Sequence, residues 1–64
     1  MSVLLTTELT RILNNMIIER KYAQDSCKTA VAKLDFEAVQ YYKGKIAVYD
    51  LYIRTIEIQL ERVK

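Results

Sequence analysis

The sequence predicts an all-α protein, a two-helix antiparallel hairpin that self-associates into a helical bundle, either a four-helix dimer or a higher oligomer. Three observations lead to this fold class. The chain has no proline and one glycine, so the usual signals for turns are nearly absent. Its second half carries an apolar heptad pattern that continues unbroken for about 25 residues. A second apolar stripe lies on the nearly opposite face of that segment, and one partner helix can cover only one face.

Length and composition limit what the chain can do. Its 64 residues form one domain, 1–64, and a domain this small is marginal unless it associates or is cross-linked. Cys27 is the only cysteine and there is no histidine, so neither an internal disulfide nor a Cys/His zinc site is expected. The start of the chain does not resemble a signal peptide, and no apolar run reaches the roughly 18–20 residues of a membrane span. We therefore expect a cytoplasmic protein without membrane contact, in the host cytoplasm if the chain is viral.

The first helix is expected over about 3–33. Its apolar positions fall in two blocks with helical spacing, and the pattern slips by one step at 19–21, between the blocks. The first block has large side chains and the second has small ones. The blocks are Leu5, Leu9, Ile12 and Met16, followed by Ala23, Cys27, Ala30 and Leu34.

The turn is expected over about 33–36. Asp35 is a good N-cap, Glu37 falls in the first turn of the next helix, and Lys33 falls where the first helix would end. A break at 24–26 is the alternative. One continuous helix is a further alternative, but it would be about 96 Å long and would leave its second stripe unpaired.

The second helix is expected over about 36–63. Its first stripe is a heptad seam that faces the first helix, and its second stripe is centred about 150° away on the helical wheel. We expect this second stripe to form the oligomer interface, so that a further copy of the chain is a partner. The seam is Val39, Tyr42, Ile46, Tyr49, Ile53, Ile56, Leu60 and Val63. The expected oligomer interface is Tyr41, Val48, Leu51, Thr55 and Ile58, with Gly44 on the same stripe.

Folding the chain back near residue 34 sets the expected core of the hairpin. Facing residues have numbers that add up to about 69, so small side chains of the first helix meet bulky ones of the second near the turn. The expected hairpin core is Leu9, Ile12, Met16, Ala23, Cys27, Ala30, Val39, Tyr42, Ile46, Tyr49, Ile53, Ile56 and Leu60.

The sequence shows no pattern typical of an enzyme. No serine or cysteine is paired with a histidine base, and the single glycine rules out a glycine-rich phosphate loop. Asp50 and Glu57 share a helix face, but Lys43 and Arg54 lie among them, which is typical of a solvated face. We expect no catalytic residue, no metal site and no cofactor.

A basic, tyrosine-bearing region near the turn is the candidate binding site. Residues 20–45 hold six basic and three acidic side chains, a net charge of +3 in a chain whose total is +2. This charge indicates either a solubilising rim or a site for a small anion or nucleic acid. Gly44 costs about 1 kcal/mol inside a helix, which close approach of a second helix or of a ligand would justify. The candidate residues are Tyr41, Lys43, Gly44, Lys45, Lys28 and Lys33.

The second half of the chain also resembles small phage-encoded helical-hairpin proteins. The resemblance lies in an acidic–aromatic turn, a Tyr-x-x-Gly-x-Ile run and an apolar heptad tail. The matching residues are Asp35, Phe36, Tyr41, Gly44, Ile46 and Tyr49. Where roles are known for such proteins, they act by binding, and the resemblance therefore implies a viral protein that inhibits a host protein or sequesters a cyclic-nucleotide signal.

Three functions fit these observations. The first is a non-enzymatic oligomeric binding protein that inhibits a host defence or regulatory protein. The second is an oligomer that sequesters a small anionic ligand such as a (cyclic) nucleotide. The third is a hairpin dimer that binds RNA or DNA, and the low net charge counts against it.

Overall fold

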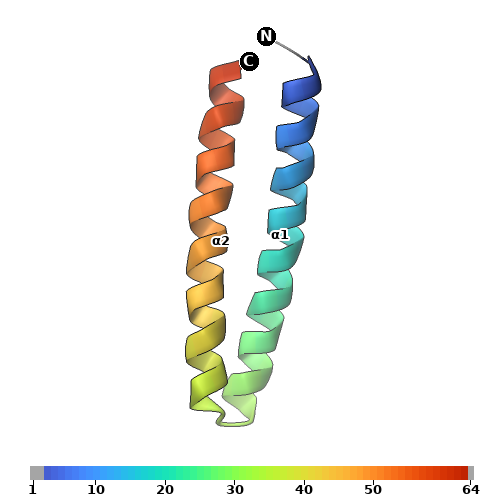
Figure 1. The fold of residues 1–64 in the computed structure, drawn as a ribbon. Helices are drawn as coiled ribbons and strands as arrows, with labels where there is room; N and C mark the ends of the chain where they lie inside the picture. The colour runs from blue at the N-terminus through green and yellow to red at the C-terminus, as the bar shows by residue number, and fades with distance from the viewer. Residues whose placement is uncertain (1–2, 64) are drawn as a thin grey trace.

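Two antiparallel helices make up the fold in the computed structural model, which describes residues 3–63. Helix α1 comprises Val3–Ala32 and helix α2 comprises Phe36–Val63, and no strand occurs in this range. The start of α1 and the end of α2 lie at the same end of a rod, and the turn lies at the other (Figure 1). The rod extends over 49 × 14 × 11 Å. The predicted all-α class is thus confirmed, with two helices.

Asp35 starts α2 as an N-cap. Its side-chain Oδ1 accepts a hydrogen bond from the N–H of Ala38 at 3.2 Å, and its carbonyl oxygen accepts one from the N–H of Val39 at 3.0 Å. Glu37 follows in the first turn, where the positive end of the helix dipole favours a carboxylate. The local sequence therefore determines where the second helix begins.

Leu34 ends α1 in a left-handed conformation, with φ of 58°. Its N–H donates to the carbonyl of Val31 at 3.0 Å, and the N–H of Asp35 donates to the carbonyl of Ala30 at 2.9 Å. These two bonds form a Schellman motif, in which glycine normally takes the left-handed position. Helix α1 continues through Gln24–Ser26, so the alternative turn at 24–26 is wrong.

Replacing Leu34 with glycine is expected to raise the free energy of unfolding by roughly 0.5–1 kcal/mol. Glycine adopts a positive φ without the Cβ strain that leucine experiences, and the 71% exposed leucine side chain contributes little packing. Urea denaturation at one fixed protein concentration measures the change. The matched control is Leu34→Ala, which keeps the Cβ and should show no such gain.

The inner face of α2 follows the expected heptad seam. Val39 and Ile53 are buried, at 7% and 5% exposure. The other seam positions are half-buried, namely Tyr42, Ile46, Tyr49, Ile56, Leu60 and Val63. An unbroken period of 3.5 residues keeps one stripe of a helix against its partner, so α1 covers this stripe along its length.

The inner face of α1 differs from the expected one in its first half. Ile12 is 37% exposed and Leu5 is 36% exposed, whereas Leu13 is half-buried. The heptad does not slip at 19–21, because Arg20 occupies a seam position and carries the spacing through. The residues that face α2 are Thr6, Leu9, Leu13, Met16, Arg20, Ala23, Cys27 and Ala30.

Arg20 joins the two helices near the middle of the rod. Its guanidinium Nη1 lies 2.7 Å from Oδ1 of Asp50 on α2, and the two side chains are 32% and 51% exposed. The aliphatic part of the arginine fills the seam position while its charged end reaches solvent. This pair adds little to stability, because a partly exposed ion pair contributes about 1 kcal/mol at most.

Small side chains bring the helices together near the turn. Ala23 and Ala30 are both 5% exposed, and Cys27 lies half-buried between them. Figure 1 shows the helices closer at the turn than at the chain ends. The larger seam residues of α1, Leu9, Leu13 and Met16, all lie in its first half, away from the turn. Only four residues of the described chain are buried, so the hairpin has a very small core of its own.

Candidate functional site

The outer face of α2 is an apolar surface that the hairpin leaves uncovered. We use "outer face" for Tyr41, Gly44, Val48, Leu51, Thr55 and Ile58. The side chains of Val48, Leu51 and Ile58 are 50%, 62% and 47% exposed, and that of Tyr41 is 60% exposed. The face is centred about 150° from the seam, so α1 lies on the opposite side of the helix and cannot cover it.

Gly44 lies on the outer face in open space. A Cβ atom added there would meet no atom within 4 Å outside its own stretch of helix. One of the two sequence-based explanations for this glycine was close packing against another helix. Helix α1 does not approach it, so packing within the hairpin does not explain the glycine. The sequence-based explanation that is left is close approach by a ligand or partner from outside the hairpin, and it stays a prediction.

Replacing Gly44 with alanine is expected to stabilise the monomeric hairpin by about 1 kcal/mol, because alanine has the higher helix propensity and meets no neighbour here. Thermal unfolding followed by circular dichroism at low protein concentration measures it. The matched control is Ala47→Gly, one turn along the same helix at another exposed position, which should lose a similar amount. Destabilisation by Gly44→Ala under these conditions would contradict the open environment.

A cluster of aromatic and basic side chains borders the outer face near the turn. The rings of Tyr41 and Tyr42 meet edge to face, with centroids 5.1 Å apart and an angle of 74° between the planes. Nζ of Lys45 lies 5.7 Å from the centroid of the Tyr41 ring, which is a cation–π distance. Tyr41 therefore contacts both Tyr42 and Lys45.

The structure does not gather the predicted basic site into one place. Lys45 lies at Tyr41 on α2, whereas Lys28 lines an open groove between the helices and Lys33 lines a separate depression beside Ser26 and Thr29. The groove has a volume of about 530 Å³ and is lined by Lys21, Gln24, Asp25, Cys27, Lys28, Val31 and Ile46. Three of the predicted lysines thus belong to three different surroundings.

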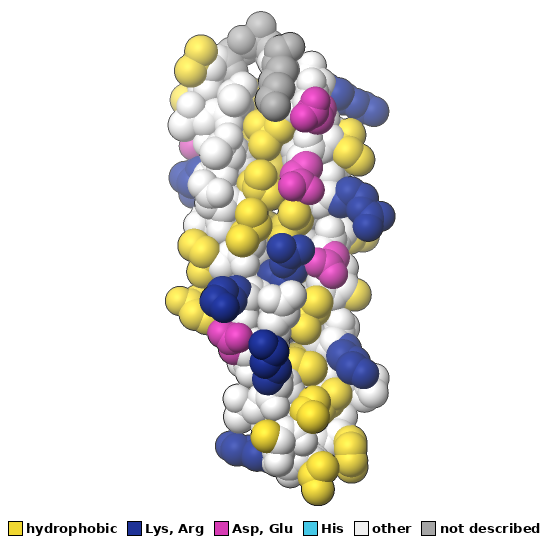
Figure 2. Space-filling view, turned by 180° about the vertical axis from the view of Figure 1, so that it is seen from behind, with side chains coloured by type: hydrophobic (Ala, Val, Ile, Leu, Met, Phe, Trp, Pro, Cys, Tyr) yellow, Lys and Arg dark blue, Asp and Glu magenta, His cyan; other side chains and the backbone are white. Residues whose placement is uncertain are grey.

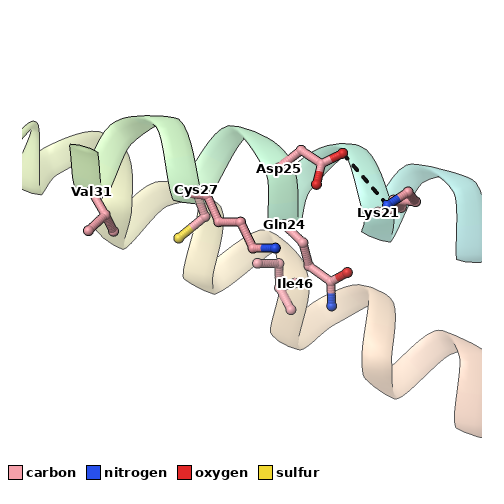
Figure 3. A pocket seen from close by; sticks show the side chains of 7 residues that line it. Lys21, Gln24, Asp25, Cys27, Val31 and Ile46 are labelled. Carbon is pink, nitrogen blue, oxygen red and sulfur yellow. Dashed lines mark ion pairs between the residues drawn. The ribbon is translucent and has the colours of Figure 1, made fainter. Parts of the chain in front are cut away.

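The groove between the helices carries little net charge. Figure 3 shows Ile46 of α2 beneath Cys27 and Gln24 of α1, with Asp25 turned toward Lys21. Nζ of Lys21 lies 3.9 Å from Oδ2 of Asp25, and this pairing offsets one of the two positive charges in the lining. The groove is thus a shallow, mostly apolar hollow with one remaining lysine charge.

Charge is nevertheless distributed unevenly along the rod. Figure 2 shows Lys and Arg side chains, in dark blue, along the whole rod, whereas acidic side chains, in magenta, lie mainly over the half away from the turn, so the half nearest the turn has the excess of positive charge on this face. At the far end, Arg11 donates a hydrogen bond to Glu8 at 2.8 Å and, by this bond and its charge, lowers the pKa of the Glu8 carboxyl. Both groups are exposed, so this pair adds little to stability.

Residues 3–63 offer neither a metal-binding cluster nor a membrane span. No group of three or more His, Cys, Asp and Glu side chains in this range could hold a metal ion. Neither described helix is long and apolar enough to cross a bilayer.

Comparisons with protein-family models, with curated proteins and with solved structures find no match for this chain. The resemblance of its second half to small phage-encoded helical proteins therefore stays a prediction.

Two positions that sequence reasoning missed shape the surface of the hairpin. Arg20 was read as a break in the pattern, although it continues the heptad spacing from Leu13 and Met16 to Ala23. Leu34 carried no turn signal, because leucine is rarely left-handed. Spacing alone, without regard to polarity, would have identified Arg20.

Proposed function

We propose that the protein is a non-enzymatic binding protein that acts through the outer face of α2. One observation supports this most strongly: Val48, Leu51 and Ile58 form an exposed apolar row on the side of α2 that faces away from α1. A row of apolar side chains at helical spacing fits an apolar surface on another helical protein. Binding there would bury side chains that the hairpin leaves in water.

The target proposed here is a defence or regulatory protein of the host, and the place of action is the host cytoplasm. The resemblance of residues 35–49 to small phage proteins supports this class of target. The mode of action is occlusion, in which α2 covers a surface that the target needs for its own contacts. The lack of histidine and of a paired nucleophile supports a role without catalysis.

Photo-crosslinking in the host cell tests the proposal. Leu51 is replaced by p-benzoylphenylalanine, and the matched control carries the same residue at Lys28, on α1 and away from the outer face. We expect position 51 to label one discrete host protein, and the additional change Val48→Glu to abolish that adduct. Equal labelling from both positions, or labelling that survives Val48→Glu, would refute binding through this face.

Sequestration of an anionic ligand remains the second candidate function. The contact of Lys45 with Tyr41 and the positive half of the rod nearest the turn favour it. The distribution of Lys28, Lys33 and Lys45 over separate surroundings weakens it, because a small nucleotide needs its contacts in one place. The net charge of only +2 counts against binding to RNA or DNA.

A further inference from the structure

We infer that the outer face of α2 pairs with the same face of a second copy of the chain, with the two α2 helices antiparallel about a two-fold axis. The inference rests on the proposed function, because it names an occupant of the same face. In the free protein a second copy would cover this face, and a host target would have to displace it.

The spacing of the outer face is the first argument. Extended by one position at each end, the stripe begins at Glu37 and ends at Arg62, with alternating steps of four and three residues. This pattern of steps reads the same in both directions. Two antiparallel copies can therefore place every stripe position opposite another, with facing residue numbers that add up to 99. Self-complementarity of this kind is what a two-fold interface requires.

The side chains that face each other in this register are compatible. Gly44 lies opposite Thr55, and two small residues let helix backbones approach closely. This gives the exposed glycine the neighbour that the hairpin does not supply. The bulkier positions also match, since Tyr41 lies opposite Ile58 and Val48 lies opposite Leu51.

Charge selects the antiparallel direction. Glu37 of each copy lies opposite Arg62 of the other, so the dimer holds two such pairs, one at each end of the interface. A parallel pairing would instead place Glu37 opposite Glu37 and Arg62 opposite Arg62. Like charges that face each other across a helix interface repel, and this repulsion disfavours the parallel pairing.

Neighbouring positions add no conflict. Along one margin of the interface, Lys45 lies opposite Tyr52, and along the other, Ala47 lies opposite Arg54. Neither contact brings two like charges together.

Size also favours a second copy. A standard interface buries about 800 Å² on each partner, and the hairpin exposes 5002 Å² in all while burying only four residues. Helix α2 spans about 42 Å, at 1.5 Å per residue, over which such an interface can extend. A chain of this size has a small core of its own, and association with a second copy is one of the ways in which such chains gain stability.

Sedimentation equilibrium over a range of concentrations tests the inference with two charge reversals. Glu37→Arg and Arg62→Glu are each expected to weaken the dimer about tenfold, because each variant places like charges at both ends of the antiparallel interface. The double variant exchanges the charges and should restore the wild-type affinity. The matched control is Lys28→Glu, a reversal on α1 that should leave the dimer unchanged.

Mixing the two single variants provides a second measurement that does not depend on the stability of either. The Glu37→Arg variant carries Arg at both positions, and the Arg62→Glu variant carries Glu at both. A heterodimer of the two forms two Arg–Glu pairs in the antiparallel register, whereas each homodimer brings like charges together. Heterodimers should therefore exceed homodimers in native mass spectrometry. Retention of the dimer by both single variants would overturn the register. A monomeric wild-type chain at 100 µM (the highest concentration of the series), or a dimer that survives Leu51→Glu, would overturn the inference.

These outcomes separate the inference from the proposed function. If the chain is monomeric and position 51 still labels a host protein, the inference fails and the proposed function stands. If the charge reversals behave as expected and no host protein is labelled, self-association stands and the host target fails.

Discussion

Replacing Ile53 with alanine is expected to lower the free energy of unfolding by about 2–4 kcal/mol. Ile53 is 5% exposed and is the largest of the four buried side chains, so its removal leaves a cavity in a core that has little else. Stability in a chain of this size is itself only a few kcal/mol. The variant should therefore be largely unfolded at a temperature where the parent chain is helical.

Urea denaturation followed by circular dichroism at 222 nm measures this loss. Ile58→Ala is the matched control, because it removes the same atoms from the same helix at a position that is 47% exposed. At concentrations below dimerisation the control should cost no more than about 1 kcal/mol. Equal losses for the two variants would contradict the assignment of Ile53 to the core and Ile58 to the surface.

Replacing Ala30 with leucine is the second large effect, with an expected loss of roughly 1–3 kcal/mol. Ala30 is 5% exposed at the end of the rod where the helices converge, so a larger side chain must push α1 and α2 apart beside the turn. That movement also strains the Schellman motif, in which the carbonyl of Ala30 accepts the N–H of Asp35.

Thermal unfolding of Ala30→Leu and of Ala32→Leu, at the same protein concentration, tests this account. Ala32 is exposed two residues further along the same helix, so leucine there should change the midpoint temperature little. A neutral Ala30→Leu would show that the helices can separate near the turn without cost.

The fold was predictable from sequence wherever the residues at the seam positions are apolar. All eight inner-face residues of α2, from Val39 to Val63, carry apolar or aromatic side chains, and the heptad follows from them directly. In α1 the same spacing passes through Thr6 and Arg20, so a pattern that counts only apolar residues broke at Arg20 and selected Ile12 in place of Leu13. The sequence pattern did not reveal the contact that accommodates Arg20 at the seam. Its guanidinium pairs with Asp50, which lies thirty residues further along the chain.

The candidate site was predictable only in part, for a reason of helix geometry. The outer face of α2 repeats at helical spacing, so its exposure could be expected before the structure. The basic site, in contrast, was predicted from the net charge of residues 20–45, which carries no information on where the side chains point. Lys28 and Lys33 are five residues apart on or beside one helix, which turns them roughly 140° from each other, so they could not line a common pocket.

The left-handed turn at Leu34 also determines which stripes of the two helices can meet. In one uninterrupted helix, the inner-face spacing of α1 would continue from Ala30 through Leu34 to Glu37 and Tyr41, along the outer face of α2. The seam of α2 would then lie about 150° away from the inner face of α1 on the same rod. A chain with α1 and α2 fused into one straight helix could therefore not restore the seam contacts by pairing with a second copy. Reversal of the chain at Leu34, where φ is 58°, is what allows the two seams to face each other.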